Sequence, residues 1–337
     1  MTKKLKPALA IVSTCTNKKR GRPEKSCRLD ACIQGTCALT AKKWLSSLQN
    51  SKHVKKPAIC MYGGDHWKET LHCLDVARQG DFDADLWVLS AGWGLIPAEM
   101  PIVPYAATFA AGHDSVQNLR WPRDYTVREK SRAWWTELHK RRKLSDAPTL
   151  SDLPGVFGKK RKPTFLFIIS REYFPAVEPD LVVLASKGSK VAIVSAGLYR
   201  ERSIVSPLLK DFVLPLSDKF KQVRRLNKPN TSLNAHLATW IVRKYPKLLA
   251  DDIDGLGRAV AKIGDSLPAM KRKKPKKMTD AQVLEFIDKH YDPATSSATK
   301  LLRRLRDRGI GSCEQKRFGG LFRDYVRSNR NKGLFDG

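Results

Sequence analysis

ALAIVST, residues 8–14, is a run of seven apolar or small residues on consecutive positions, and three of them are β-branched. A strand with one solvent-exposed face would alternate apolar and polar residues, whereas a continuous apolar run is typical of a strand buried on both faces of a sheet. Five other runs have the same character: PAICMYGG (57–64), LWVLSAG (86–92), TFLFIIS (164–170), LVVLAS (181–186) and VAIVSAG (191–197). Each is predicted to be a buried strand.

Helical patterns separate these runs, over residues 39–50, 67–79, 115–141 and 231–246. Alternation of buried strands with helices predicts an α/β fold: a mostly parallel sheet flanked by helices. We expect residues 1–250 to form this domain, and its length is sufficient for a large core.

The remainder of the chain changes character and predicts a small all-α C-terminal domain. Residues 251–277 are predicted to be a linker, because they are turn-rich and end in the basic run KRKKPKK (271–277). Residues 278–337 contain a capping-box pattern, Thr279 with Gln282, and two further helical segments around the turn GIG (309–311). This spacing favours a helix-turn-helix-like domain. The alternative is a basic helical hairpin that packs on the main domain.

The charge of the chain points to a polyanionic partner. Its 337 residues include 63 Lys and Arg but only 33 Asp and Glu, a net charge of +30. We therefore expect nucleic acid as the partner, DNA in preference to RNA. The residues expected to bind it are Lys271, Arg272, Lys273, Lys274, Lys276, Lys277, Arg303, Arg304, Lys316 and Arg317. No apolar stretch approaches the ~20 residues of a membrane span, and no signal sequence is evident, which predicts a cytoplasmic protein without a membrane partner.

The cysteines argue against a disulfide scaffold, because there are seven in a long chain. Cys27, Cys32 and Cys37 recur every five residues, and His53 lies downstream. Structural zinc is one interpretation, but the CxxC pairs typical of such sites are missing. Reduced structural thiols are the preferred interpretation, and no metal is expected.

Small, polar and charged residues follow the predicted strands at the point where each strand ends. Two strands end in the same triplet, Ser90-Ala91-Gly92 and Ser195-Ala196-Gly197. Ligands of parallel sheets bind outside the carboxyl ends of the strands, so these ends are expected to form one pocket. Its candidate catalytic residues are Cys15 as a nucleophile, and Asp65 and His66 as general acid or base. The alternatives are a buried strand-end thiol for Cys15 and a helix-capping role for His66.

Other residues at these ends are suited to bind a substrate. Glycines let backbone N–H groups approach a ligand, lysines and arginines neutralise phosphate, and aromatic rings stack on bases. No Walker or GxGxxG pattern is present, so no nucleotide cofactor is expected. The residues predicted to bind the substrate are Lys18, Lys19, Ser90, Gly92, Trp93, Tyr105, Ser195, Gly197 and Arg200.

One part of the chain resembles a bacterial and phage family of YaaA-like proteins, related more distantly to the uracil-DNA-glycosylase α/β fold. In that family a strand ends in Cys-Ser-Lys-Lys-like residues, a later strand reads Leu-Ser-Ala-Lys-Tyr-Gly-Leu, and Pro-Tyr-x-x-Thr follows. The resemblance covers residues 8–110. The matching positions are Cys15, Lys18, Lys19, Ser90-Ala91, Gly94-Leu95, Pro104-Tyr105 and Thr108, whereas Gly92-Trp93 replaces the family's Lys-Tyr.

The resemblance implies nucleic-acid modification, and most concretely a DpdC-like enzyme acting on a nitrile-bearing 7-deazaguanine base within DNA. Partner proteins from the same DNA-modification gene cluster are then expected. The main hypothesis is therefore a DNA-binding enzyme that modifies or processes a nucleobase. The alternative is a non-catalytic nucleic-acid-binding module of a modification or bacterial defence system, and a third hypothesis is a DNA glycosylase. A nuclease is disfavoured, because the DFDAD acidic run (81–85) precedes a strand instead of following one.

Overall fold

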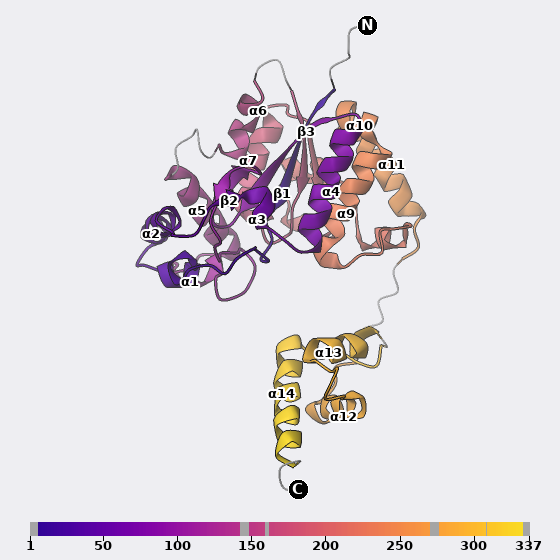
Figure 1. The fold of residues 1–337 in the computed structure, drawn as a ribbon. Coiled ribbons are helices and arrows are strands. Elements are labelled where there is room, and N and C mark those ends of the chain that lie inside the picture. The colour runs from indigo at the N-terminus through magenta and orange to yellow at the C-terminus, as the bar shows by residue number, and fades with distance from the viewer. Residues whose placement is uncertain (1–5, 142–147, 159–161, 270–275, 308, 333–337) are drawn as a thin grey trace. The chain divides into compact units, whose positions relative to one another are not determined.

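The structure is a computed structural model that describes residues 6–141, 148–158, 162–269, 276–307 and 309–332 (Figure 1). The chain divides into two compact units, Met1–Ala269 and Met270–Gly337. Each unit has its own apolar core within the described residues. The two units are therefore described separately.

The first unit is built on a sheet whose strand order is β4-β3-β1-β6-β7 within the described residues. β1 (Ala8–Thr14) lies in the middle and pairs in parallel with β3 (Asp83–Ser90) and with β6 (Thr164–Ile168). β7 (Val191–Val194) continues the parallel order, whereas β4 (Gly94–Pro97) runs antiparallel at the β3 edge. All seven residues of β1 are buried, as expected for a strand covered on both faces. The α/β prediction is confirmed.

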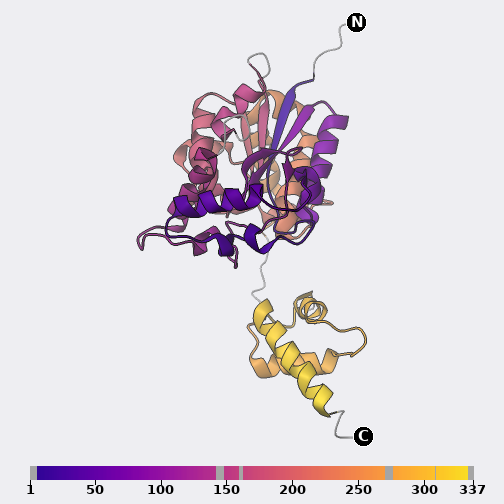
Figure 2. The same cartoon turned by 60° about the vertical axis from the view of Figure 1, so that its left-hand side comes forward.

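Helices cover both faces of this sheet (Figures 1 and 2). On one face α4 (Asp65–Gln79) packs along α9 (Asn230–Lys244). On the other face α5 (Val127–Lys140) packs on α7 (Phe174–Ser186). The buried carboxylate of Glu178 links these two helices, because it binds the guanidinium groups of Arg128 and Arg132.

The remaining elements of the first unit are shorter or peripheral. A second small sheet pairs β2 (Lys56–Pro57) with β5 (Pro101–Ile102) in antiparallel order. The other α-helices are α1 (Leu29–Cys32), α2 (Cys37–Gln49), α3 (Ala58–Met61), α6 (Leu153–Val156), α8 (Ala196–Arg200), α10 (Pro246–Asp251) and α11 (Ile253–Ser266). The short 3-10 helices are η1 (Lys25–Cys27), η2 (Val116–Asn118), η3 (Leu150–Asp152), η4 (Arg202–Ile204), η5 (Pro207–Phe212) and η6 (Asp218–Gln222).

Two of the predicted strands are helical. The run 181–186 is the second half of α7, whose buried residues Val177, Leu181 and Leu184 recur at helical spacing while Val183 is exposed. A short apolar run cannot distinguish a strand from a buried helix, and here the helix prevails. The run 57–64 contains only the end of β2, followed by the single turn α3.

Two other predictions hold only in part. The predicted helix over 115–141 is the short η2 followed by α5, which begins at a Thr126–Glu129 capping box. Residues 88–97 contain the end of β3, a turn and β4, so this stretch is a hairpin that the sequence did not predict. Gly94 has a φ of 71°, a left-handed conformation that glycine adopts readily in such a turn.

Within the predicted linker, residues 251–269 belong to the first unit, and most of them are helical. α11 occupies residues 253–266 and buries Leu256 and Val260 against the core of that unit. The boundary falls between residues 269 and 270. The acidic start of the segment caps the helix, because Asp252 accepts a hydrogen bond from the Gly255 amide (2.8 Å). Residues 270–275 lie outside the described part of the chain.

The second unit consists of α12 (Asp280–His290), α13 (Ala298–Asp307) and α14 (Gln315–Lys332). The predicted capping box of Thr279 and Gln282 is present at α12. A pair of backbone hydrogen bonds between Lys276–Met278 and Ser312 connects the entry of the unit to the turn before α14. The predicted helical C-terminal domain is thus present, and α14 is continuous through Gly319-Gly320.

Gly92 supplies a test of the packing around the β3–β4 turn. A Cβ on this residue would lie 2.5 Å from the ring of Tyr105 and 3.1 Å from Trp44, both buried. We expect Gly92→Ala to lower the free energy of unfolding by about 1–3 kcal/mol, because overpacking forces these rings from their positions. Urea denaturation measures the effect.

The matched control is Gly35→Ala, since nothing lies within 4 Å of a Cβ at that glycine. Equal stability of the Gly92→Ala variant and the wild type would contradict the packing assigned to Tyr105.

Candidate functional site

A cavity of about 600 Å³ lies at the carboxyl ends of the parallel strands in the first unit. The chain leaves β1 toward α4 on one face and leaves β6 toward α7 on the other, so the cavity lies where the direction of the connections reverses. Its lining residues are Thr14, Cys15, Thr16, Asn17, Lys18, Gly63, Gly64, Asp65, His66, Thr108, Ala110, Ser170, Arg171, Glu172, Tyr173, Ser195, Ala196, Gly197, Arg200, Asp218, Asn230, Thr231, Leu233 and Asn234. This is the position at which open α/β sheets bind ligands.

The cavity brings together the three residues predicted to be catalytic, Cys15, Asp65 and His66. Four of the predicted substrate-binding residues line it as well: Lys18, Ser195, Gly197 and Arg200. The other five are not part of the lining: Lys19, Ser90, Gly92, Trp93 and Tyr105. Trp93 and Tyr105 are buried in the core, and neither presents a ring in the cavity on which a base could stack.

The two Ser-Ala-Gly triplets have different structural roles. After β3, Ser90 accepts hydrogen bonds from the amides of Gly92 and Trp93, and this tight turn leads into β4. After β7, Ser195 is the N-cap of α8, and Gly197 lines the cavity with ordinary space around it. The glycine of the first triplet is required by packing, and only the second triplet lies at the cavity.

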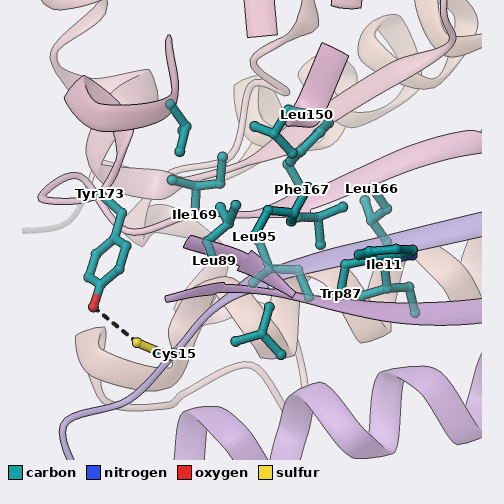
Figure 3. Close-up of a cluster of buried hydrophobic side chains, with 14 of the residues drawn as sticks. Ile11, Cys15, Trp87, Leu89, Leu95, Leu150, Leu166, Phe167, Ile169 and Tyr173 are labelled. Atoms are coloured by element: carbon teal, nitrogen blue, oxygen red, sulfur yellow. Dashed lines mark hydrogen bonds between the residues drawn. The ribbon is translucent and has the colours of Figure 1, made fainter. Parts of the chain in front are cut away.

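Cys15 directly follows β1 and lies beside a hydroxyl cluster that consists of Tyr62, Ser90, Tyr105 and Tyr173. Its Sγ is 3.1 Å from the Tyr173 Oη, the contact drawn in Figure 3, and 3.6 Å from the Tyr105 Oη. Tyr105 also contacts the hydroxyls of Tyr62 (3.0 Å) and Ser90 (2.7 Å). Of the hydroxyl cluster, Tyr173 alone lines the cavity, together with Cys15.

Burial keeps the hydroxyl cluster protonated. It raises the pKa of Tyr105 and of Tyr173 well above the usual value, and the nearby Cys15 sulfur raises them further. Both phenols can therefore donate a hydrogen bond to a negative charge at Cys15 or on a ligand beside it. The Lys19 ammonium lies 4.2 Å from the centre of the Tyr105 ring. Burial lowers the pKa of Lys19, and the nearby Cys15 opposes this shift in part.

His66 is fixed in the first turn of α4. Its Nε2 lies 3.2 Å from the Ser13 Oγ, which is also 3.2 Å from the Thr70 Oγ1. Burial lowers the pKa of His66 to about 4, so the imidazole is neutral at pH 7. A neutral imidazole can hold a ligand by a hydrogen bond, but a pKa this low makes it a weak general base near neutral pH.

Loop contacts place the start of α4 beside the end of β1. The Thr16 hydroxyl donates to the Gly63 carbonyl (2.8 Å), and the Gly63 amide donates to the Lys18 carbonyl (2.9 Å). Gly64 has a φ of 89°, which directs the chain into the helix, and as N-cap it offers no side chain to the first-turn amides. The exposed Asp65 begins the helix at the cavity.

The charges around the cavity are balanced. Its basic residues are Lys18, Arg171 and Arg200, and its acidic residues are Asp65, Glu172 and Asp218. Arg171 and Arg200 both approach Glu201, at 2.8 and 3.7 Å. A pocket of this kind suits an uncharged polar ligand better than a bare phosphate.

Two residues that line the cavity, Tyr173 and Asn234, are not among the predicted site residues. Tyr173 follows Ser170-Arg171-Glu172 at the end of β6, and no local pattern indicated that its hydroxyl would turn back to Cys15. Asn234 on α9 accepts a hydrogen bond from the Ala196 amide and donates one to the Ile169 carbonyl, each 3.0 Å long. It thereby holds the ends of β6 and β7 at a fixed separation.

Two of the three cysteines considered for zinc, Cys27 and Cys32, are buried, and Cys37 is partly buried. Burial raises the pKa of both Cys27 and Cys32, and raises that of Cys37 to about 12. Cys27 and Cys32 contact oxygen atoms of nearby serines, for example Cys32 the Ser26 carbonyl (3.2 Å). Among the described residues, no three His, Cys, Asp or Glu side chains gather as they would around a metal ion.

The predicted nucleic-acid-binding residues of the second unit have different surroundings. Arg303, Arg304 and Lys316 are exposed. Arg317 is held in an ion pair with Asp280 and donates to the Met278 carbonyl (3.0 Å), so it connects α14 to the start of α12. Lys276 and Lys277 belong to the entry of the unit, whereas Lys271, Arg272, Lys273 and Lys274 lie outside the described residues.

Comparison with known proteins gives no relative for this chain: no family model matches it, and neither does any curated protein. In the part of the chain that the structure describes, none of the helices combines the length and apolar character needed to cross a bilayer. The function is therefore inferred from the geometry of the two units.

The pKa of His66 provides a test of the site's burial. The unfolded side chain titrates near 6.5 and the folded one near 4, so stability is lost as the pH falls through this window, because only the unfolded state takes up the proton. We expect His66→Gln to reduce the loss of unfolding free energy between pH 7 and 4 by up to about 3 kcal/mol. Urea denaturation at a series of pH values measures it.

His113→Gln is the control, since His113 is exposed. The same pH dependence in His66→Gln and the wild type would refute the burial of the imidazole.

Proposed function

We propose that the protein is an enzyme that modifies a nucleobase within DNA, with Cys15 as its nucleophile. The observation that carries this proposal is the position of Cys15: the thiol lies in the cavity at the carboxyl end of the central strand, beside the protonated hydroxyl of Tyr173. A nucleophile beside a fixed proton donor can form a covalent adduct whose developing negative charge the donor neutralises.

The size and charge of the cavity support a base as the ligand. A cavity of about 600 Å³ accommodates a nucleotide-sized group. Because the lining carries three basic and three acidic residues, it favours the uncharged base over the phosphate. An enzyme that acts on a base in duplex DNA must extrude that base into such a pocket. The net charge of +30 then holds the surrounding phosphates.

The reaction that we propose is hydration of the nitrile on a 7-deazaguanine base, the substrate that the resemblance implies. The Cys15 sulfur adds to the nitrile carbon while its thiol proton passes to the Tyr173 oxygen. The Tyr173 hydroxyl proton passes to the nitrile nitrogen, so a thioimidate forms and Tyr173 remains a neutral phenol. Water then adds to the same carbon and the thiolate leaves, which yields the primary amide after proton transfer. The sum is nitrile plus water to amide, and no oxidant or reductant is consumed.

The hydroxyl cluster supports this order of events. The Tyr173 Oη lies 3.1 Å from the Cys15 Sγ, so it can reach a nitrile nitrogen that is two bonds away from this sulfur. Tyr105 donates toward the sulfur from the protein side (3.6 Å) and stabilises the thiolate that leaves. Lys19 adds positive charge behind Tyr105. Asp65, exposed at the cavity, is suited to orient the attacking water.

Nucleoside mass spectrometry tests the proposal. DNA that carries the nitrile-bearing base is incubated with the purified full-length protein and digested, and the nitrile and amide nucleosides are quantified. We expect the amide to form, and we expect Cys15→Ser to slow its formation at least about 100-fold, because a hydroxyl is a much weaker nucleophile than a thiolate.

Cys60→Ser is the matched control, since Cys60 is an exposed thiol on α3, and it should retain full activity. Thermal unfolding of each variant establishes that it is folded. An unchanged nucleoside profile with wild-type protein would overturn the nitrile reaction. Full activity in Cys15→Ser would overturn the role of the thiol.

A further inference from the structure

Helix α14 has two chemically distinct sides. One side carries Phe318, Leu321, Phe322 and Tyr325, and belongs to the core of the second unit. Phe322 and Tyr325 pack edge-on against the Tyr291 ring, and the Tyr325 hydroxyl donates to Asp288 on α12 (2.6 Å). This side fixes the orientation of α14, so the opposite side must face solvent.

The solvent side of α14 is a cationic stripe. Lys316, Gly320, Arg323 and Arg327 follow one another at intervals of four, three and four residues, which places them on one face of a helix. The three basic side chains are exposed, and no described residue forms a hydrogen bond or ion pair with them. The neighbouring Arg317 differs, because Asp280 neutralises it. Within the described part of the second unit, the stripe is therefore positive charge without an intramolecular partner.

Gly320 in the stripe and its neighbour Gly319 are not required by the fold. A Cβ at Gly320 would meet nothing within 4 Å, and one at Gly319 would lie 3.7 Å from Arg323, an ordinary contact. Glycine is the least favourable residue after proline inside a helix, so two in succession reduce helix stability without a packing benefit. Gly92 is the opposite case, because the core demands it. The pair leaves one turn of α14 without side chains at these two positions.

A hollow of about 530 Å³ borders the same side of α14. It is formed by the start of α13 and the first half of α14, and Glu314 is its one acidic member among the described residues. The lining residues are Ala298, Thr299, Leu302, Glu314, Gln315, Lys316, Gly319 and Arg323. The cationic stripe thus continues into a concave surface instead of a flat one.

We infer that this side of α14 docks in the major groove of duplex DNA. Lys316, Arg323 and Arg327 contact phosphates, and the Gly319-Gly320 surface lies closest to the groove floor. The inference rests on the proposed function, and it adds which surface of the second unit carries the duplex. Charge complementarity identifies the occupant, since unpaired lysine and arginine on one helix face bind the phosphate backbone.

The dimensions agree with this placement. Lys316 and Arg327 are eleven residues apart, about 16 Å along a helix, and the major groove is about 12 Å wide. An α-helix is about 10–12 Å across with its side chains, so it fits along this groove, and basic side chains at both ends of the stripe can contact the phosphates that border the groove. The glycines lie between them, where the absence of side chains allows the helix axis to approach the bases.

The test is the salt dependence of duplex binding by the full-length chain. A random-sequence DNA duplex is titrated by fluorescence anisotropy between about 50 and 200 mM salt. We expect Arg323→Ala to weaken binding and to reduce the slope of log K against log salt by about 0.9, the value for one lost phosphate contact. Lys289→Ala, which removes an exposed charge from α12, should leave the slope unchanged.

Gly320→Leu tests the close approach. We expect it to weaken binding at least about tenfold, since a side chain would hold the helix away from the groove. Its thermal midpoint should not fall, because helix propensity improves. Gly257→Leu on α11, where a Cβ also meets open space, is the control.

The outcomes separate this inference from the proposed function. Absence of DNA binding by the wild type would overturn both. Wild-type binding with an unchanged slope in Arg323→Ala and unchanged affinity in Gly320→Leu would overturn only the role of α14. Equal or tighter binding to duplex RNA of the same sequence, or to vesicles of anionic lipid, would overturn the choice of duplex DNA.

Discussion

The parallel pairing of β1 with a strand on each side is the constraint on which the first unit depends. A strand buried along its whole length can offer a polar or reactive group only where it leaves the sheet, and β1 leaves it at Cys15. The same end of β6 leads to Tyr173, and that of β7 leads to Ser195. Cys15, Tyr173 and Ser195 therefore meet at one edge of the sheet, because the buried parts of the strands do not reach a ligand.

The parts of the fold that sequence could predict are those with long, consistent patterns. The four buried parallel strands and helices α2, α4 and α9 were predicted from continuous or periodic apolar residues. The errors came from short runs: LVVLAS has the composition of a strand, and only its packing in α7 shows that it is helical. The hairpin to β4 was missed because Gly92 was interpreted as a ligand-binding position.

The site was predicted as a location more accurately than as a set of contacts. The rule that ligands bind at strand ends placed Cys15, Asp65 and His66 in one cavity, as the structure does. It could not reveal that Tyr105 lies behind Cys15 in the core, or that Tyr173 turns toward it. Such contacts join residues about 90 and 158 positions apart, and periodicity carries information only about near neighbours.

The amide of Asn234 couples two parts of the unit that are distant in sequence. It is donor and acceptor at once, so α9 is tied to the last carbonyl of one strand region and to the first amide of α8. Aspartate at this position could not donate, and leucine could neither donate nor accept. One planar group thus holds α9 against both segments. Because α9 lines the cavity through Asn230, Thr231, Leu233 and Asn234, a rigid-body shift of this helix would reshape that part of the cavity wall without moving Cys15 or Tyr173.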